Sequence, residues 1–425
     1  MMTEFKKIEG VIIGKKYKPG FRFRYGVTIP LVEQEEFALC LEHDGLNIPM
    51  ANSLMKLADE GKAPYCVTVG VTAGHIVMPN ETERNMRMNT YDLFDREYSD
   101  FVVYELIPHI EKEYSVKFAA SPDMHMVSGG SSGGISAFLI AWFHTEYFRR
   151  VYMSSPSFLA MARGNEIPYL IRKYETKPIR IYQEWSENEP NYYFGWSRSI
   201  DDESNAALIF AGYDYKSKYF PGEGHCSRYY NEQEAYIRLE WLWQDWDTKP
   251  IEAPKNSPLV DRVIPFGSKW EICDNMPENA VYEVPAVLGG YDRAVLSNDK
   301  MAWYGANIDD DMIYMYVNDE NICEERRLLH NTLHTIPRYN PRGVIDMVVD
   351  GTDKLFALTA IGIQCVRSYG LSDVILDLPD DSKPLEINIT DALYVKTEKG
   401  IYRRELCADC TDFTEPRRKF ADYYD

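Results

Sequence analysis

The sequence of 425 residues predicts a doubly wound α/β fold with a mostly parallel sheet, followed by a smaller β-rich domain. In the first part of the chain, short apolar runs alternate with longer segments of helical periodicity, the pattern of a sheet covered by helices on both faces. After a Pro-rich polar stretch, the helical periodicity disappears and short strand-like runs remain. We therefore expect a first domain over residues 1–247, a linker over 248–258 and a second domain over 259–425.

The elements expected in the first domain follow the order that a doubly wound sheet requires. The run at 65–71 is apolar throughout, which is typical of a strand buried on both faces of a parallel sheet. Residues 74–90 are polar and are expected to form a loop. The expected strands are 8–33 (a strand pair), 37–42, 65–71, 125–127, 148–158, 179–184 and 215–220, and the expected helices are 50–61, 98–114, 135–142, 201–211 and 231–246.

The composition limits the class of partner and the compartment. The formal net charge is −20, which argues against nucleic acid and against an anionic membrane surface, because both bind basic faces. The first residues lack the apolar run of a signal peptide, and no stretch approaches the roughly 20 apolar residues of a membrane span. The eight cysteines are scattered, apart from Cys407-x-x-Cys410, so we expect reduced thiols in a cytoplasmic protein. Since that pair lacks further ligands nearby, we expect no metal and no cofactor.

A glycine-rich stretch at 127–138 organises the first domain. A short strand-like run precedes it and a buried helix is expected after it. Between them, Gly130-x-Ser132-x-Gly134 fits the strand–turn–helix motif that exposes a nucleophilic serine at the tip of a strained turn, often with positive φ. Glycines are needed two positions before and after the serine because strand and helix pass close together. Ser132 is therefore the predicted nucleophile.

Ser131 is the rival nucleophile, because Gly129-x-Ser131-x-Gly133 also fits the motif. We prefer Ser132, since it leaves a full strand before the turn and puts Gly133 at the start of the helix. The amide of Gly133 would then point at the oxyanion of a tetrahedral intermediate, with the helix N-terminus behind it.

A second oxyanion donor is expected from the turn at 43–46, which follows an apolar strand. In serine hydrolases of this layout, the loop after that strand supplies the second amide. Gly45 or Leu46 would supply it here. The alternative is an ordinary turn that ends a strand.

A serine hydroxyl needs a base within hydrogen-bond reach and a carboxylate that orients the base. His225 lies in a glycine-flanked loop after the last expected strand, and the order serine, acid, histidine places the base there. The acid is expected just after residues 179–184, where Glu184, Glu187 and Glu189 lie. We favour Glu189 and keep Glu187 as the alternative acid. Any of them could instead be a solvated loop carboxylate.

Several segments together resemble the Putative esterase family, which includes the enterochelin esterases and the esterase D-like enzymes. They are residues 129–134, Glu184-x-x-x-x-Glu189-Pro190, Ala211-Gly212-Tyr213-Asp214, Gly222-Glu223-Gly224-His225, Arg87-x-x-x-Tyr91-Asp92 and Tyr104-Glu105-Leu106-Ile107-Pro108. The resemblance covers roughly residues 8–246. It implies an α/β-hydrolase fold with Ser132, Glu189 and His225 as nucleophile, acid and base.

The predicted function is hydrolysis of a small-molecule carboxylic ester through an acyl-enzyme on Ser132. Trp185, Tyr193 and Trp196 are expected to line the substrate pocket. The main alternative is a non-catalytic protein that binds a carbohydrate or aryl ligand on the aromatic loop 192–196. That loop could also simply pack over the mouth of the active site, and a peptidase is a third option.

An internal repeat marks the second domain. Residues 355–363 match residues 393–401, and a period of about 40 residues is the size of a β-propeller blade. Residues 351–404 resemble the last blades of the gluconolactonase/SMP-30 family, although the metal-binding set of that family has no counterpart here. We expect a β-rich accessory module. Because it is shorter than a full propeller, pairing with a second copy in a homodimer is a further expectation.

Overall fold

The computed structural model describes residues 3–159, 164–278, 282–318, 327–332, 334, 341–367 and 370–413. The chain divides into two compact units. Unit 1 comprises Met1–Ile171 and Thr176–Lys255, and unit 2 comprises Arg172–Glu175 and Asn256–Asp425. The boundary after Lys255 falls inside the stretch expected to be a linker. The segment Arg172–Glu175 belongs to unit 2, although it lies within the first domain expected from the sequence.

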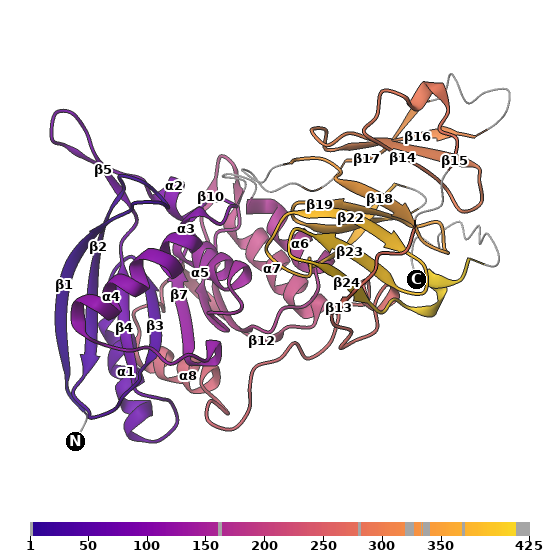
Figure 1. Ribbon diagram of the computed structural model, residues 1–425. Helices are drawn as coiled ribbons and strands as arrows, with labels where there is room; N and C mark the ends of the chain where they lie inside the picture. The colour runs from indigo at the N-terminus through magenta and orange to yellow at the C-terminus, as the bar shows by residue number, and fades with distance from the viewer. Residues whose placement is uncertain are drawn as a thin grey trace. The chain divides into compact units, whose positions relative to one another are not determined.

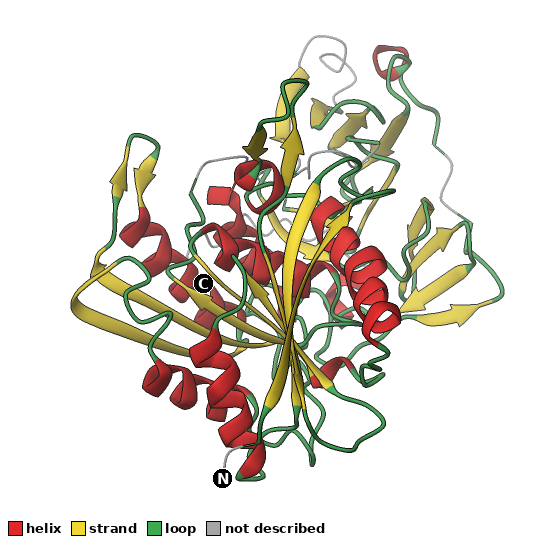
Figure 2. Cartoon of the chain, turned by 90° about the vertical axis from the view of Figure 1, so that its left-hand side faces the viewer, coloured by secondary structure: helices red, strands yellow, loops and turns green. Residues whose placement is uncertain are grey.

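Unit 1 is built on one ten-stranded mixed sheet in the order β12-β9-β8-β7-β3-β4-β2-β5-β6, with β1 paired to β2. The six parallel strands are β12 (Asp214–Gly224), β9 (Arg180–Asn188), β8 (Arg150–Ser154), β7 (His125–Gly130), β3 (Ala38–His43) and β4 (Cys66–Val71). The strands joined in antiparallel fashion beyond them are β2 (Arg22–Pro30), β1 (Phe5–Ile13), β5 (His75–Val77) and β6 (Glu83–Asn85). Figure 2 shows the strong twist of this sheet.

Helices cover both faces of the sheet, so the predicted doubly wound α/β fold is confirmed (Figure 1). On one face, α1 (Ile48–Asp59) and α8 (Glu232–Leu242) pack together over an apolar core with the central strands. The helices on the other face are α2 (Arg87–Tyr91), α3 (Glu97–Phe101), α4 (Ile107–Tyr114), α5 (Ser132–Phe143) and α7 (Ser197–Ala211). A π-helical turn, Val102–Leu106, joins α3 to α4, and α6 spans Ile167–Lys173.

α5 is apolar on all sides, and its residues 132–142 are buried. Such a helix cannot lie at the surface, so it is enclosed on every side. It contacts β7 and β8 of the sheet and α2 and α3 outside them. This packing fixes the first turn of α5 firmly against the end of β7.

The polar segment 74–90 is more ordered than expected. It contains the short hairpin of β5 and β6 and the start of α2 rather than a simple loop. Glu83 pairs with Arg22 at 3.0 Å and also with Arg24, both on β2. Ion pairs between segments far apart in the sequence stabilise this hairpin, and local polarity does not reveal them.

Unit 2 contains three four-stranded antiparallel sheets within its described residues. The first holds β14 (Arg293–Leu296), β15 (Ala302–Ala306), β16 (Met312–Val317) and β17 (Arg327–Thr332). The second holds β18 (Asp346–Val349), β19 (Leu355–Thr359), β20 (Gly362–Val366) and β21 (Ser372–Leu376). The third holds β22 (Pro384–Ile389), β23 (Leu393–Thr397), β24 (Ile401–Arg404) and β13 (Glu271–Cys273).

The internal repeat corresponds to equivalent strands of two successive sheets. Residues 355–363 form β19 and the start of β20, and residues 393–401 form β23 and the start of β24. One apolar core lies between the first and second sheets, and another lies between the second and third.

The thiols of Cys407 and Cys410 contact the backbone carbonyls of Asp261 and Arg262. Across the described residues of both units, no helix combines the length and the apolar character that crossing a membrane would require.

Candidate active site

Ser131 stands at the tip of the turn between β7 and α5. β7 ends at Gly130 and α5 begins at Ser132, so Ser131 is the single residue between them. Its backbone has φ 56° and ψ −127°, a region that residues with a side chain seldom adopt. The expectation that Ser132 occupies the tip is therefore wrong. Ser132 is the first residue of the helix and is buried.

The glycines explain this shift by one residue. A Cβ on Gly129 would lie 2.1 Å from the carbonyl oxygen of Gly133, so strand and helix cross most closely at these two residues. They are the residues two positions before and two positions after Ser131. A Cβ on Gly130 would lie no closer than 3.1 Å to its neighbours, and one on Gly134 no closer than 3.2 Å. Both alignments of the motif fit the sequence, and only this crossing distinguishes them.

Glu189 and His225 meet at the carboxyl ends of two neighbouring strands. Glu189 follows β9 and His225 follows β12, which pair in parallel with Asn188 opposite Gly224. The Nδ1 atom of His225 forms a short hydrogen bond with Oε2 of Glu189. The side chain of Glu189 has no exposed surface, whereas that of His225 is 23% exposed.

The other two carboxylates near the end of β9 have different partners. Glu187 accepts a hydrogen bond from the amide of Gly222 at 2.7 Å in an exposed position. Glu184 is buried and pairs with Arg238 at 2.8 Å. Of the three carboxylates, Glu189 is therefore the one hydrogen-bonded to His225.

The remaining oxygen of Glu189 is held by two donors. Its Oε1 accepts the hydroxyl of Ser155 at 2.6 Å and the amide of Ser186 at 3.0 Å. Burial by itself raises the pKa of Glu189, but hydrogen bonds from His225 and Ser155 outweigh burial and hold it below its ordinary value. For His225, burial lowers the pKa, and the hydrogen bonds with Cys226 and Glu189 outweigh it and raise the pKa above its ordinary value. Glu189 thus remains ionised beside the imidazole.

The loop that carries His225 packs against the turn that carries Ser131. The residue after His225 is Cys226, and a Cβ on Gly130 would lie 3.1 Å from its Sγ atom. Cys226 Sγ also donates to the carbonyl of Ser154 at 3.3 Å, and the amide of Ser131 donates to that same carbonyl at 2.9 Å. The ends of β7, β8, β9 and β12 therefore bring the serine, the acid and the histidine to one edge of the sheet.

Residues 40–204 match the family model described as "Putative esterase". This match includes Glu189 and the turn between β7 and α5 that carries Ser131, which we call the elbow. No curated protein sequence is significantly similar to the chain. The family match supports ester hydrolase activity in unit 1.

Three solved structures are similar to part of this chain. A ferulic acid esterase is 17% identical with a TM-score of 0.45, over 56% of this chain and 98% of that one. The enterobactin esterase of Shigella flexneri is 17% identical with a TM-score of 0.42, over 57% of this chain and 61% of that one. An enterochelin esterase structure from Shigella flexneri is 19% identical with a TM-score of 0.42, over 56% and 58%. The match thus spans about three fifths of the chain in each of the two Shigella structures. The family match ends at residue 204, so the resemblance of unit 2 to gluconolactonases stays a prediction.

The turn after β3 borders the first turn of α5, but not through the residues expected. A Cβ on Gly133 would lie 2.9 Å from Cβ of His43 and 3.4 Å from a carboxylate oxygen of Asp44. The amide of Gly45 donates to the carbonyl of Val71 at 3.2 Å, so it is already engaged. Leu46 also lies on the β4 side, because its amide nitrogen is 2.2 Å from where a Cβ on Gly70 would lie. The residues that face the helix are therefore His43 and Asp44, which argues against Gly45 and Leu46 as oxyanion donors.

Of the three residues expected to line a substrate pocket, Trp185 is enclosed in the fold. Its Nε1 donates to Asp202 at 2.9 Å, and the residue is buried. Tyr193 and Trp196 are 98% and 47% exposed on a small hairpin of β10 (Asn191–Tyr192) and β11 (Gly195–Trp196). This hairpin follows Glu189 directly, and the amide of Ser197 closes it on the carbonyl of Pro190 at 3.0 Å. An exposed aromatic surface is therefore fixed to the chain beside the acid.

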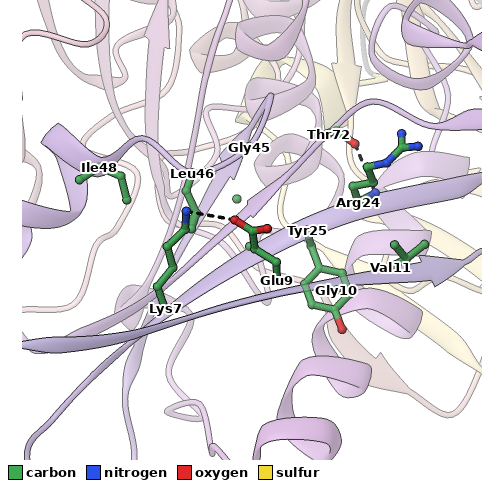
Figure 3. A pocket seen from close by; sticks show the side chains of 12 residues that line it. Lys7, Glu9, Gly10, Val11, Arg24, Tyr25, Gly45, Leu46, Ile48 and Thr72 are labelled. Atoms are coloured by element: carbon green, nitrogen blue, oxygen red, sulfur yellow. Dashed lines mark hydrogen bonds and ion pairs between the residues drawn. The ribbon is translucent and has the colours of Figure 1, made fainter.

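A pocket of about 500 Å³ in unit 1 lies over β1, β2 and β4 (Figure 3). Lys7 and Glu9 form an ion pair of 3.0 Å at its side. Its lining includes Gly45 and Leu46 but none of Ser131, Glu189 and His225. The pocket is therefore a hollow on the face of the sheet and is separate from the catalytic group.

A charged group beside the elbow was missed as a functional feature. Arg87 forms a short ion pair with Asp44 and stacks on the ring of Tyr91 at 5.0 Å. Burial raises the pKa of the neighbouring Asp92 to about 6, although Ser132 and the charge of Arg87 lower it. The available signal was the spacing of Arg87, Tyr91 and Asp92, which only the family resemblance had singled out. This group makes the α2 side of the site polar.

Proposed function

We propose that unit 1 is a serine hydrolase that cleaves a carboxylic ester of a small molecule through an acyl-enzyme. Ser131 is the nucleophile, His225 the base and Glu189 the acid. The observation that carries this assignment is the strained, positive-φ backbone of Ser131 at the end of β7, at the same sheet edge as the hydrogen-bonded pair of Glu189 and His225. The match of residues 40–204 to an esterase family supports it.

Each residue has a defined task in this mechanism. His225 takes the hydroxyl proton of Ser131 as the oxygen attacks the ester carbonyl, and Glu189 stabilises the imidazolium that forms. We assign the oxyanion role expected of Gly133 to the amide of Ser132, because Ser132 is the residue after the nucleophile Ser131. This amide donates to the developing oxyanion at the N-terminus of α5. His225 then protonates the departing alcohol and afterwards activates the water that releases the acyl group.

The decisive experiment compares the two adjacent serines. We expect Ser131→Ala to lower kcat for p-nitrophenyl acetate by about a thousandfold or more and to abolish labelling by a fluorophosphonate. Ser132→Ala keeps the backbone amide and should retain both labelling and most of the turnover. Native turnover and labelling in Ser131→Ala would remove this proposal.

A second candidate function is non-catalytic binding of an aryl or carbohydrate ligand. The observation that favours it is the exposure of three aromatic side chains on the β10–β11 hairpin, Tyr192 at 43%, Tyr193 at 98% and Trp196 at 47%. Calorimetry with an aryl glycoside and with a neutral oligosaccharide tests it. Saturable binding that Tyr193→Ala weakens, in a protein without esterase activity, would favour this function over hydrolysis.

A further inference from the structure

Ser155 occupies a strained backbone position directly behind the acid. It follows β8, is 1% exposed, and has a φ of 44°. Its amide donates to the carbonyl of Glu184 at 2.6 Å, which holds the backbone in this conformation. A positive φ is unfavourable for a residue with a side chain, and glycine avoids that strain. The strain suggests that the serine side chain has a task that glycine could not perform.

The hydroxyl of Ser155 joins the acid to the loop of the base. It donates to Oε1 of Glu189 at 2.6 Å and accepts from the amide of Cys226 at 3.2 Å. The directions are fixed, because a carboxylate accepts and an amide donates. The amide that donates to the Ser155 hydroxyl belongs to Cys226, the residue next to His225. One hydroxyl therefore bridges the carboxylate and the segment that carries the imidazole.

A glutamate acid needs such an anchor. Its side chain has several rotatable bonds, so a productive contact with His225 requires the carboxylate to be fixed from another side. The donors from Ser155 and Ser186 both bind Oε1 and leave Oε2 for the imidazole. These contacts set the orientation of the carboxylate as well as its position.

The charges around Glu189 make the hydrogen bond from the Ser155 hydroxyl necessary. Asp201 of α7 is a second buried carboxyl nearby, and burial together with the charge of Glu189 raises its pKa well above the ordinary value. The imidazole of His225 is hydrogen-bonded to Glu189, and Cys226 is the next residue. The Ser155 hydrogen bond is among the contacts that lower the pKa of Glu189 against its burial. Without it, the ionised carboxylate would lose one of its three donors.

We propose that Ser155 is a positioning residue of the catalytic group, which sets the orientation of Glu189 and ties it to the His225 loop. This inference rests on the proposed hydrolase function. Ser155 does not touch the substrate in this scheme. It acts only through Glu189 and Cys226.

The test uses two substitutions that separate the hydroxyl from the backbone. Ser155→Gly removes the hydroxyl and relieves the strain, whereas Ser155→Ala removes the hydroxyl and keeps the strain. We expect both variants to lower kcat for p-nitrophenyl acetate by about 10- to 100-fold with little change in KM. We also expect the acid limb of the kcat/KM profile to move upward by about half a pH unit or more, because losing a donor makes the carboxylate more basic and raises the pKa of His225. If Ser155 mattered only through its backbone strain, Ser155→Gly and Ser155→Ala would instead differ from each other in kcat.

A proton NMR measurement makes the test independent of turnover. The Nδ1 proton of His225 should give a far-downfield resonance in the native protein, and this resonance should move or broaden in Ser155→Gly. Native kcat, an unmoved acid limb and an unchanged resonance in Ser155→Gly would overturn the positioning role alone, provided Ser131→Ala is inactive. Native turnover in Ser131→Ala would overturn the hydrolase function and this inference together. Melting temperatures of both Ser155 variants identify any loss of fold.

Discussion

The Nδ1 atom of His225 is hydrogen-bonded to a carboxylate, that of Glu189, whose side chain has no exposed surface. Water cannot screen this pair from the side of the acid, so the carboxylate charge acts on the imidazole more strongly than it would in solvent. The same burial protects the hydrogen bond from competition by solvent. The pair therefore determines how activity should depend on pH.

The first prediction concerns that pH dependence. His225 must be neutral to accept a proton, and its pKa is raised above the ordinary value of about 6.5. The value of kcat/KM should thus rise with pH and reach half its maximum above pH 6.5. A profile measured with p-nitrophenyl acetate from pH 5 to 9, corrected for spontaneous hydrolysis, checks this expectation.

Glu189→Gln is the matched variant for this profile. Removing the charge should move the acid limb to lower pH and decrease kcat by about 10³- to 10⁴-fold, because the imidazolium loses its partner. An acid limb at or below pH 6.5 in the native protein, unmoved in the variant, would contradict the pairing of His225 with Glu189 in solution.

The second prediction concerns the contact between the elbow and the turn after β3. A Cβ on Gly133 would lie 2.9 Å from Cβ of His43, an atom close to the backbone that cannot swing aside. Gly133→Ala should displace this turn and reduce kcat by about 10- to 100-fold. It should lower the melting temperature only slightly. Steady-state kinetics and thermal unfolding on the same preparation separate the two effects.

Ser136→Ala is the control, because it lies one turn further along α5. Its hydroxyl is buried and forms no hydrogen bond with the described part of the chain. Removing it should cost little stability and leave activity close to native. Equal kinetic losses in Gly133→Ala and Ser136→Ala would indicate a general disturbance of α5 and not a displaced turn.

The third prediction concerns Glu42, which lies at the end of β3 and is fully buried. Burial raises its pKa to about 8, although a hydrogen bond from the amide of Asn47 and the charge of Arg238 lower it. In the unfolded chain it ionises near pH 4.3. Between these values the folded protein keeps a proton that the unfolded chain has lost, so the free energy of unfolding falls as pH rises.

Glu42→Gln removes this titration and keeps the shape of the side chain. Relative to the native protein, the variant should gain stability as pH rises from 4.5 to 8, by up to about 1.4 kcal/mol per pH unit. Urea unfolding of unit 1 at several pH values measures the difference. A stability difference that does not change with pH would show that Glu42 is ionised in the folded state.

The order of elements in unit 1 could be predicted because hydrophobic periodicity determines it. The apolar run of β4 and the periodic apolar positions of α1 are local signals, and the parallel sheet follows from their alternation. The proximity of Glu189 and His225 also follows from this order, since both come directly after strands that pair in parallel.

The position of the elbow serine could not be predicted, because Ser131 and Ser132 lie in a run with two glycines on each side. The sequence pattern fits both serines, and only the backbone crossing at Gly129 and Gly133 separates them. The β5–β6 hairpin was missed because Glu83 finds its partners on β2, far away in the sequence. Ser155 gave no signal either, since its role depends on contacts from two other loops.

The fourth prediction concerns an ion pair within unit 2 that links distant parts of the sequence. Arg404 of β24 donates from both terminal nitrogens to the carboxylate of Glu175 at 2.7 Å each. Glu175 also accepts the amide of Asp377 at 2.8 Å. The side chain of Arg404 is 6% exposed, so loss of its partner would leave a buried, uncompensated charge.

Glu175→Ala should therefore destabilise unit 2 by about 3–5 kcal/mol, whereas Glu405→Ala, which removes an exposed carboxylate next to Arg404, should change stability by less than about 0.5 kcal/mol. Chemical unfolding followed by tryptophan fluorescence gives the midpoint, and ester hydrolysis measured on the same samples reports unit 1. Arg404→Met provides a further comparison, because an apolar side chain there leaves no buried charge and should cost less than Glu175→Ala. If Glu175→Ala and Glu405→Ala have equal midpoints, Glu175 is not an anchor of unit 2.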